Sequence, residues 1–243
     1  MLDINEIKTS VEKGFDFSSF LFALMNEHGF KVDKNLDLAI DLYRELSEKG
    51  IPEAQHNLGV ILLDHVKSDT SVEESVSWIK KAAASEFLPS MYLLGYFYEK
   101  GIGVEFDVAI AAEWYEKAAL SGHIQASINL GGLCEDERLE NISYSSPVYW
   151  YERVATIDGT AAFTLANFYE NGERVEKDIS KALTWYLLAS KLGSFYASNY
   201  LQLVYGKGLL GEVVDRDLEE KYSALAEEQF KIFEKNERQK EQK

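Results

Sequence analysis

The sequence predicts an all-α solenoid of about six helix-turn-helix repeats with short capping helices, because two series of residues recur at one period. A tryptophan followed by tyrosine or isoleucine returns every 35 or 36 residues, at Trp78-Ile79, Trp114-Tyr115, Trp150-Tyr151 and Trp185-Tyr186. A second series keeps the same phase, at Leu58-Gly59, Leu94-Gly95, Leu130-Gly131 and Leu165-Ala166. Self-similarity at this period is typical of stacked supersecondary units and not of a single globular core.

Each repeat is expected to hold two helices joined by a short turn, in units that begin near residues 18, 54, 90, 126, 161 and 197. In four units a glycine is expected to end the first helix, at Gly29, Gly101, Gly172 and Gly208. In two other units His65 and Glu137 stand at that position, so their turns should differ. An N-cap residue is expected to begin each second helix, at Asn35, Ser71, Asp107, Ser143, Asp178 and Asp215. Glu74 would complete a capping box with Ser71.

The two series also predict how neighbouring helices meet. A glycine in the middle of a helix costs about 1 kcal/mol relative to alanine, so its recurrence after leucine indicates the close approach of another helix. The tryptophans could stack on a ligand, but their strict period and the alanines that follow them indicate core rings. We therefore expect the indoles to join consecutive repeats.

The domain organisation follows from the repeats. Residues 1–14 are expected to form an N-terminal capping helix, residues 15–236 the repeat array, and residues 237–243 a frayed polar tail. The last helix, from about Asp217, has Lys221 where the other units have tryptophan, and a polar outer face is typical of a terminal repeat.

Composition narrows the classes of partner. The chain has 243 residues, a hydrophobic content of 46% and a formal net charge of -16. Such a charge repels nucleic acid and anionic membranes and attracts basic proteins or peptides. The longest apolar run, Phe20 to Met25, is too short to span a bilayer. The N-terminus shows no secretion signal, and Cys134 is the one cysteine, so a cytoplasmic protein is expected.

The third unit resembles the Sel-one-like repeat, a shorter-loop relative of the tetratricopeptide repeat. The residues that carry the resemblance are Leu94-Gly95, Tyr98, Gly101-Ile102-Gly103-Val104, Asp107, Trp114 to Ala119 and Gly122. The fifth unit is similar through Leu165, Tyr169, Gly172, Val175, Asp178, Lys181-Ala182, Trp185-Tyr186 and Gly193. The resemblance implies a right-handed superhelix of antiparallel helix pairs and an adaptor or scaffold that binds other proteins. It assigns no catalytic residue and no cofactor.

The same resemblance implies that the first helix of each pair lines a concave groove. The side chains predicted to bind a partner there are His56, Asp64, Tyr92, Tyr96, Glu99, Glu135, Asp136, Phe163, Asn167, Glu170, Asn199 and Lys207. Aromatic rings beside carboxylates suit a partner that presents Lys or Arg next to apolar anchors. The alternative is that Glu99 and Glu170 are ordinary solvent-facing residues near a helix end.

Other candidate sites are weaker. The four histidines have no metal-ligand spacing, so no metal site is expected. Cys134 is expected to be a small buried filler, and the charged segment 134–140 is either a partner-specific loop or a tolerant surface. Phe195, Tyr196 and Tyr200 exceed the motif and either form an exposed aromatic patch or pack against the last helix.

The sequence therefore predicts a scaffold that captures a basic protein or peptide, with no enzymatic activity, no nucleic-acid partner and no membrane partner. A sharper hypothesis is an immunity-type inhibitor of a bacterial toxin, motivated by a short, acidic array. The alternative is a regulatory or assembly adaptor with several partners, and a remote alternative is an enzyme. The oligomeric state stays open, although the Phe195–Tyr200 region could support self-association.

Overall fold

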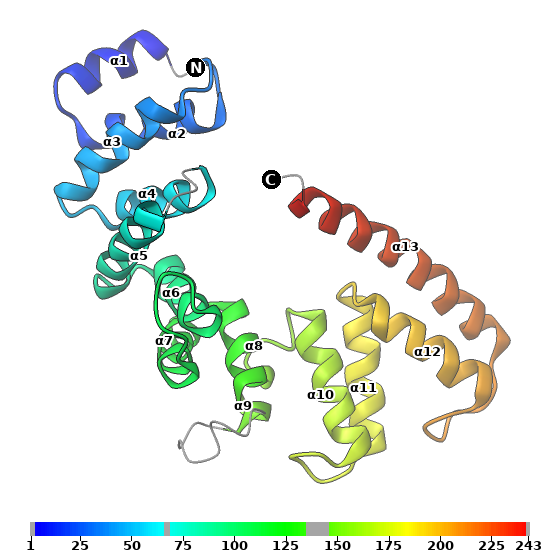
Figure 1. The fold of residues 1–243 in the computed structure, drawn as a ribbon. Helices are drawn as coiled ribbons and strands as arrows, with labels where there is room; N and C mark the ends of the chain where they lie inside the picture. The colour runs from blue at the N-terminus through cyan, green and yellow to red at the C-terminus, as the bar shows by residue number, and fades with distance from the viewer. Residues whose placement is uncertain (1–2, 66–68, 135–145, 242–243) are drawn as a thin grey trace. The chain divides into compact units, whose positions relative to one another are not determined.

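The computed structural model describes residues 3–65, 69–134 and 146–241, which contain thirteen helices and no strand (Figure 1). The predicted all-α solenoid of helix pairs is confirmed. The chain divides into two compact units, Met1–His123 and Ile124–Lys243, and each is described by itself. Within each unit, consecutive helices pack against one another in sequence order.

The first unit holds one capping helix and three helix pairs. The cap is α1 (Ile4–Glu12), and the pairs are α2 (Asp16–His28) with α3 (Leu36–Glu48), α4 (Pro52–His65) with α5 (Asp69–Ala84), and α6 (Leu88–Lys100) with α7 (Val108–Leu120). The second unit holds three more pairs. These are α8 (Ile124–Leu133) with α9 (Pro147–Glu152), α10 (Gly159–Asn171) with α11 (Ile179–Lys191), and α12 (Phe195–Lys207) with α13 (Arg216–Glu241).

In four helix pairs the first helix ends at the predicted glycine. Gly29, Gly101, Gly172 and Gly208 adopt left-handed φ angles of 68–77° directly after a first helix. Such angles carry a steric cost for any side chain with a Cβ atom, which explains the glycine.

Four of the second helices begin at the predicted N-cap residues. Asn35 Oδ1 accepts from Leu38 N at 3.0 Å, Asp107 Oδ1 from Ile110 N at 3.0 Å, and Asp178 Oδ1 from Lys181 N at 2.9 Å. Asp215 also accepts from the first turn of α13. The prediction for Ser71 is wrong, because α5 already begins at Asp69 and Ser71 lies buried inside the helix. Ser143 lies outside the described residues.

A seam of tyrosine and glycine holds the two helices of a pair together. Tyr43, Tyr115 and Tyr186 are at most 1% exposed. A Cβ atom added to Gly95 would lie 2.7 Å from Tyr115 Cδ1, so the glycine is required for the approach of α6 to α7. The space beside the mid-helix glycine is filled by Tyr115 at Gly95, by Tyr151 at Gly131 and by Ile79 at Gly59, which explains the predicted close approach.

The tryptophans differ from the prediction. Trp150 is 1% exposed, as expected of a core ring. Trp78, Trp114 and Trp185 are only partly buried. Because adjacent residues of a helix point about 100° apart, the tyrosine faces the partner helix while the tryptophan lies at the edge of the interface. In the third and fifth repeats the more deeply buried ring is thus the tyrosine after the tryptophan, Tyr115 or Tyr186.

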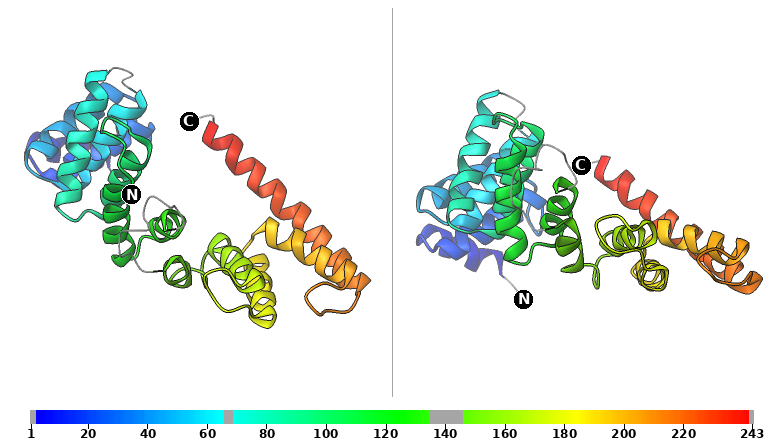
Figure 2. Two further views of the ribbon diagram at one scale, coloured as in Figure 1. Left: turned by 60° about the horizontal axis from the view of Figure 1, so that its bottom comes forward. Right: turned by 90° about the horizontal axis from the view of Figure 1, so that it is seen from below.

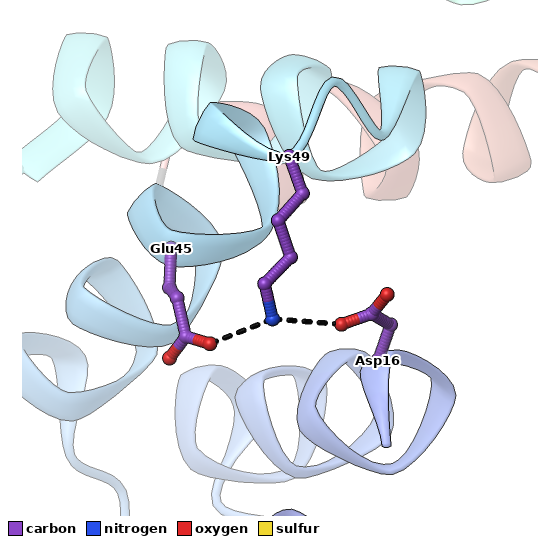
Figure 3. A network of polar contacts seen from close by, with 3 residues as sticks. All are labelled: Asp16, Glu45 and Lys49. Carbon is purple, nitrogen blue, oxygen red and sulfur yellow. Dashed lines mark hydrogen bonds and ion pairs between the residues drawn. The ribbon is translucent and has the colours of Figure 1, made fainter. Parts of the chain in front are cut away.

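Charged side chains also join neighbouring helix ends near the N-terminus. Lys49 Nζ lies 2.8 Å from Asp16 Oδ1 at the start of α2 and 2.7 Å from Glu45 Oε1 in α3 (Figure 3). Hydrogen bonds to Asp16 and Glu45 raise the pKa of Lys49 to about 12. The ammonium group therefore links the two helices across the whole neutral pH range.

Candidate functional site

The candidate site is the row of side chains that first helices carry between consecutive repeats, here named the first-helix face. In the first unit it includes His56 and Asp64 of α4, and Tyr92, Tyr96 and Glu99 of α6. In the second unit it includes Phe163, Asn167 and Glu170 of α10, and Asn199 and Lys207 of α12. Glu135 and Asp136, also predicted for this face, lie outside the described residues.

Aromatic rings on this face are held by the next repeat. His56 Nδ1 lies 2.9 Å from Ser90 Oγ, and its ring centroid lies 5.4 Å from that of Phe87. Tyr92 stacks on His123 with centroids 4.4 Å apart. Burial lowers the pKa of both His56 and His123, so both imidazoles are neutral at pH 7. The two histidines therefore serve as packing groups and add no positive charge to the face.

Tyr96 and Asp64 are more accessible than these rings. Tyr96 is half-buried, and the Nζ atom of Lys100 lies 5.9 Å from its ring centroid. Asp64 is exposed near the end of α4. These two side chains present an aromatic surface and a carboxylate within the first unit.

A repeated hydrogen bond fixes the carboxylates of the face. Tyr43 donates to Glu27 Oε2 at 2.7 Å, Tyr115 to Glu99 Oε2 at 2.7 Å, and Tyr186 to Glu170 Oε2 at 2.6 Å. Each pair is sixteen residues apart and joins the two helices of one repeat. Glu99 also accepts from Lys100 at 2.5 Å. Glu99 and Glu170, predicted as groove charges, therefore accept hydrogen bonds inside the repeat.

The second repeat shows the signal that could have revealed this bond. There the tyrosine is replaced by Ile79 and the glutamate by Leu63, so both partners become apolar together. An isolated buried hydroxyl or carboxylate is costly without its partner, which explains the joint replacement. Aligning the repeats would therefore have linked the tyrosine position with the glutamate position sixteen residues before it.

In the second unit the face combines one apolar ring with amide and charged side chains. Phe163 lies 5.6 Å from Tyr186 by ring centroids, and Asn167 Nδ2 donates to the Phe163 carbonyl at 3.1 Å. Tyr200 donates to Glu170 Oε1 at 2.6 Å, so Tyr200 is engaged inside the unit. Asn199 and Lys207, also on α12, are exposed.

The described residues carry no group of three or more His, Cys, Asp or Glu side chains that could hold a metal ion. Cys134 is half-buried at the end of the second described stretch, and the charged segment that follows it lies outside the described residues. Among the described helices, none combines the length and hydropathy that a bilayer crossing needs.

The buried tyrosines predict a pH dependence of stability. Burial, then the hydrogen bond to a carboxylate, raises the pKa of Tyr43 and Tyr186 well above the ordinary value of 10.0. A pKa that is higher in the folded state contributes stability that is complete below about pH 10 and is lost as pH rises further. We expect the free energy of unfolding to fall between about pH 10 and pH 12 in urea titrations.

Substitution of the hydroxyl separates this effect from general alkaline damage. Tyr43→Phe and Tyr186→Phe together should flatten the decline above about pH 10, since neither ring can ionise. Tyr149→Phe is the matched control, because that ring is 43% exposed. An equal decline in all three proteins would show that these tyrosines ionise as freely in the folded state as in the unfolded state.

The fold and this face together define a class, the short helix-pair repeat proteins whose first helices present a surface between repeats. The sequence model of the Sel1 repeat matches residues 20–51, 52–86, 88–123 and 160–194, which is more than half of the chain. The chain belongs to the Sel1 repeat family. A Sel1 repeat scaffold is suited to protein interaction.

Curated relatives share part of their length with the chain. The chitin synthase regulator SKT5 of Malassezia restricta is 31% identical over 130 residues, which is 51% of this chain and 9% of that protein. The DAP3-binding cell death enhancer 1 of Rattus norvegicus is 30% identical over 102 residues, or 42% of this chain and 20% of that protein. The chain thus spans a fifth or less of these two relatives.

Solved structures show the same fold. A Sel1 repeat protein from Oxalobacter formigenes superposes with a TM-score of 0.71 at 26% identity, covering 88% of each chain. The protective antigen c5321 of uropathogenic Escherichia coli gives 0.67 at 25% identity, covering 93% of this chain and 56% of that one. The immunity protein PA5088 of Pseudomonas aeruginosa gives 0.51 at 19% identity, covering 88% and 81%.

Proposed function

We propose that the first-helix face captures a protein or peptide partner that presents basic side chains beside apolar anchors. The observation that carries this proposal is the preformed state of the face in the first unit. His56 and Tyr92 are locked against the following repeat by ring packing and by the bond to Ser90. A surface that is ordered before binding loses little conformational entropy when a partner arrives.

The charge of the chain supports a basic partner. A net charge of -16 accelerates encounter with a positively charged surface and disfavours acidic competitors. On the face itself, the exposed carboxylate is that of Asp64, whereas Glu99 accepts from Tyr115 and Lys100. In this proposal charge steers the partner and the aromatic rings anchor it.

The finer proposal is an immunity-type inhibitor that neutralises one bacterial toxin in the cytoplasm. The acidic character and the preformed face are its support. PA5088, described as an immunity protein, shows that this fold occurs in a protein of that kind, and at 19% identity the likeness is one of fold alone. Sel1 repeat scaffolds are generally non-catalytic, so the role proposed is binding.

A regulatory adaptor is the second candidate. The observation that favours it is the similarity to proteins whose names describe regulation or binding, the chitin synthase regulator SKT5 and the DAP3-binding cell death enhancer 1. An adaptor would use the same face for several partners in turn.

Affinity capture of the tagged full chain from its native cells distinguishes the candidates. An inhibitor should recover one basic protein in equimolar amount, and co-expression of the chain should rescue growth from that protein. The complex should weaken as salt rises from about 0.05 to about 0.5 M, because screening removes charge steering. Recovery of several proteins without growth rescue would favour the adaptor, and a salt-independent acidic partner would contradict the basic-partner proposal.

A further inference from the structure

The last helix departs from the repeat pattern near its middle, where the preceding second helix ends. In the preceding repeat Gly193 ends the second helix, whereas the equivalent position in the last repeat is Gln229 and α13 continues to Glu241. Gln229 Nε2 donates to the Ser190 carbonyl at 2.8 Å, and its Oε1 accepts from Ser198 Oγ at 2.7 Å. These buried bonds hold α13 across the end of α11 and the start of α12.

As a result, α13 runs past the start of α12 (Figures 1 and 2). In earlier pairs the next first helix packs on the second helix, as α12 packs on α11. No described helix follows α13 in this unit. A groove of about 380 Å³ remains between α12 and α13, and its lining residues include Phe195, Ser223, Ala226, Glu227 and Phe230.

Aromatic rings gather beside this groove. Phe195 lies 5.3 Å from Phe230 and 5.2 Å from Phe233 by ring centroids. Tyr196 is 57% exposed, Phe230 43% and Phe233 41%. We name Phe195, Tyr196, Phe230 and Phe233 the C-terminal aromatic patch. An exposed cluster of this kind marks an interaction surface.

The charged side chains of α13 are spaced so that the helix can complement a second copy of itself. Glu220, Glu227, Lys231 and Arg238 lie on one stripe of the helix beside Phe230, because their spacings of seven, four and seven residues keep a common direction. All four are exposed. Along this stripe Glu220 and Glu227 precede Lys231 and Arg238, and Glu234, one turn before Arg238, pairs with it at 3.6 Å between Oε2 and Nη2. Glu227 and Lys231 are equidistant from position 229, and so are Glu220 and Arg238.

We propose that two copies of this chain associate through α13, antiparallel about a twofold axis near Gln229. Antiparallel pairing puts Glu227 opposite Lys231 of the second copy and Glu220 opposite Arg238. It also places Phe230 of each copy at the edge of the contact, because this residue lies about 80° around the helix from the stripe. A self-complementary surface of this kind is what a twofold dimer requires. The proposal is independent of the partner captured by the first-helix face.

Charge reversal with a mixing step tests the pairing. Sedimentation equilibrium of the full chain from about 1 to about 200 µM should show a reversible dimer. Glu227→Lys and Lys231→Glu should each weaken dimerisation about tenfold or more, because like charges then face each other. Mixing the two variants should restore a heterodimer near the wild-type affinity, since both facing pairs again have opposite charges.

Matched controls separate this result from unfolding. Glu113→Lys and Lys117→Glu reverse a pair with the same four-residue spacing on α7 and should leave the dimer unchanged. Phe230→Glu should abolish the dimer, whereas Ile232→Glu, about 200° away around the helix, should not. Circular dichroism confirms that each variant is folded.

Three outcomes would overturn the proposal. The first is a wild-type chain that stays monomeric throughout the concentration range. The second is a dimer that tolerates Glu227→Lys, Lys231→Glu and Phe230→Glu, which would place the contact elsewhere. The third is a monomer that sediments with phosphatidylserine vesicles and loses this binding on Phe230→Glu, which would make the basic end of α13 a membrane contact.

Discussion

Replacing Tyr115 by alanine is expected to lower the free energy of unfolding by about 3–5 kcal/mol, typical of a deleted core aromatic. The ring is fully buried and packs against Gly95, and its hydroxyl donates to Glu99 at 2.7 Å. The substitution leaves a cavity between α6 and α7 and removes the donor from a half-buried carboxylate. Both effects act on the same helix pair.

Trp114→Ala is the matched comparison, because it removes a larger ring from the neighbouring position. Trp114 is partly buried, lines an open groove on α7, and has Lys117 Nζ 4.3 Å from its ring centroid. The loss should be smaller, about 1–2 kcal/mol, because less surface leaves water. Urea unfolding followed by circular dichroism measures both variants. A larger loss of stability for Trp114→Ala than for Tyr115→Ala would show that the tryptophan is the main core ring of this repeat.

Gly95→Ala is expected to destabilise the chain by about 1–3 kcal/mol, although alanine favours helix by about 1 kcal/mol over glycine. The new methyl group would lie 2.7 Å from Cδ1 of the fully buried Tyr115 ring, so the ring or the helix has to shift. Gly131→Ala should behave alike, since its methyl group would lie 2.8 Å from Tyr151 Cζ.

Gly132→Ala is expected to stabilise the chain, the opposite of the effect expected for Gly95→Ala. This glycine neighbours Gly131 in α8 but is exposed, and an added Cβ atom would lie 3.8 Å from the Tyr151 hydroxyl. Helix propensity alone should then stabilise the chain by up to about 1 kcal/mol. Thermal unfolding of the three variants decides between steric and propensity control. Stabilisation in all three would show that the helices do not need the glycine.

Much of the fold could be predicted from residues whose role is local. A left-handed turn needs glycine at Gly101, and an N-cap needs an oxygen acceptor at Asp107, so both features were predictable from residue type and period. Ser71 shows the limit of such reasoning. Its residue type fits a cap, but α5 begins two residues earlier, at Asp69.

Which of the two rings is more deeply buried could not be predicted, because tryptophan and tyrosine occupy adjacent positions with the same period. Only the placement of the partner helix decides which ring is enclosed, and that placement puts Tyr115 inside and Trp114 at the edge. The carboxylates of the first-helix face were likewise ambiguous. Glu170 has the spacing of a surface charge, but Tyr186 and Tyr200 both donate to it.

The most direct test of the binding role compares two tyrosines on one helix. Tyr96 belongs to the first-helix face of α6, whereas Tyr98 packs with Lys80 of α5, whose Nζ lies 5.7 Å from the ring centroid. Once the captured partner is purified, isothermal titration calorimetry gives its affinity for each folded variant. Tyr96→Ala should weaken binding about tenfold or more, as for an aromatic anchor, while Tyr98→Ala should stay within about twofold. Equal affinities for Tyr96→Ala and the wild type would contradict a binding role of the first-helix face.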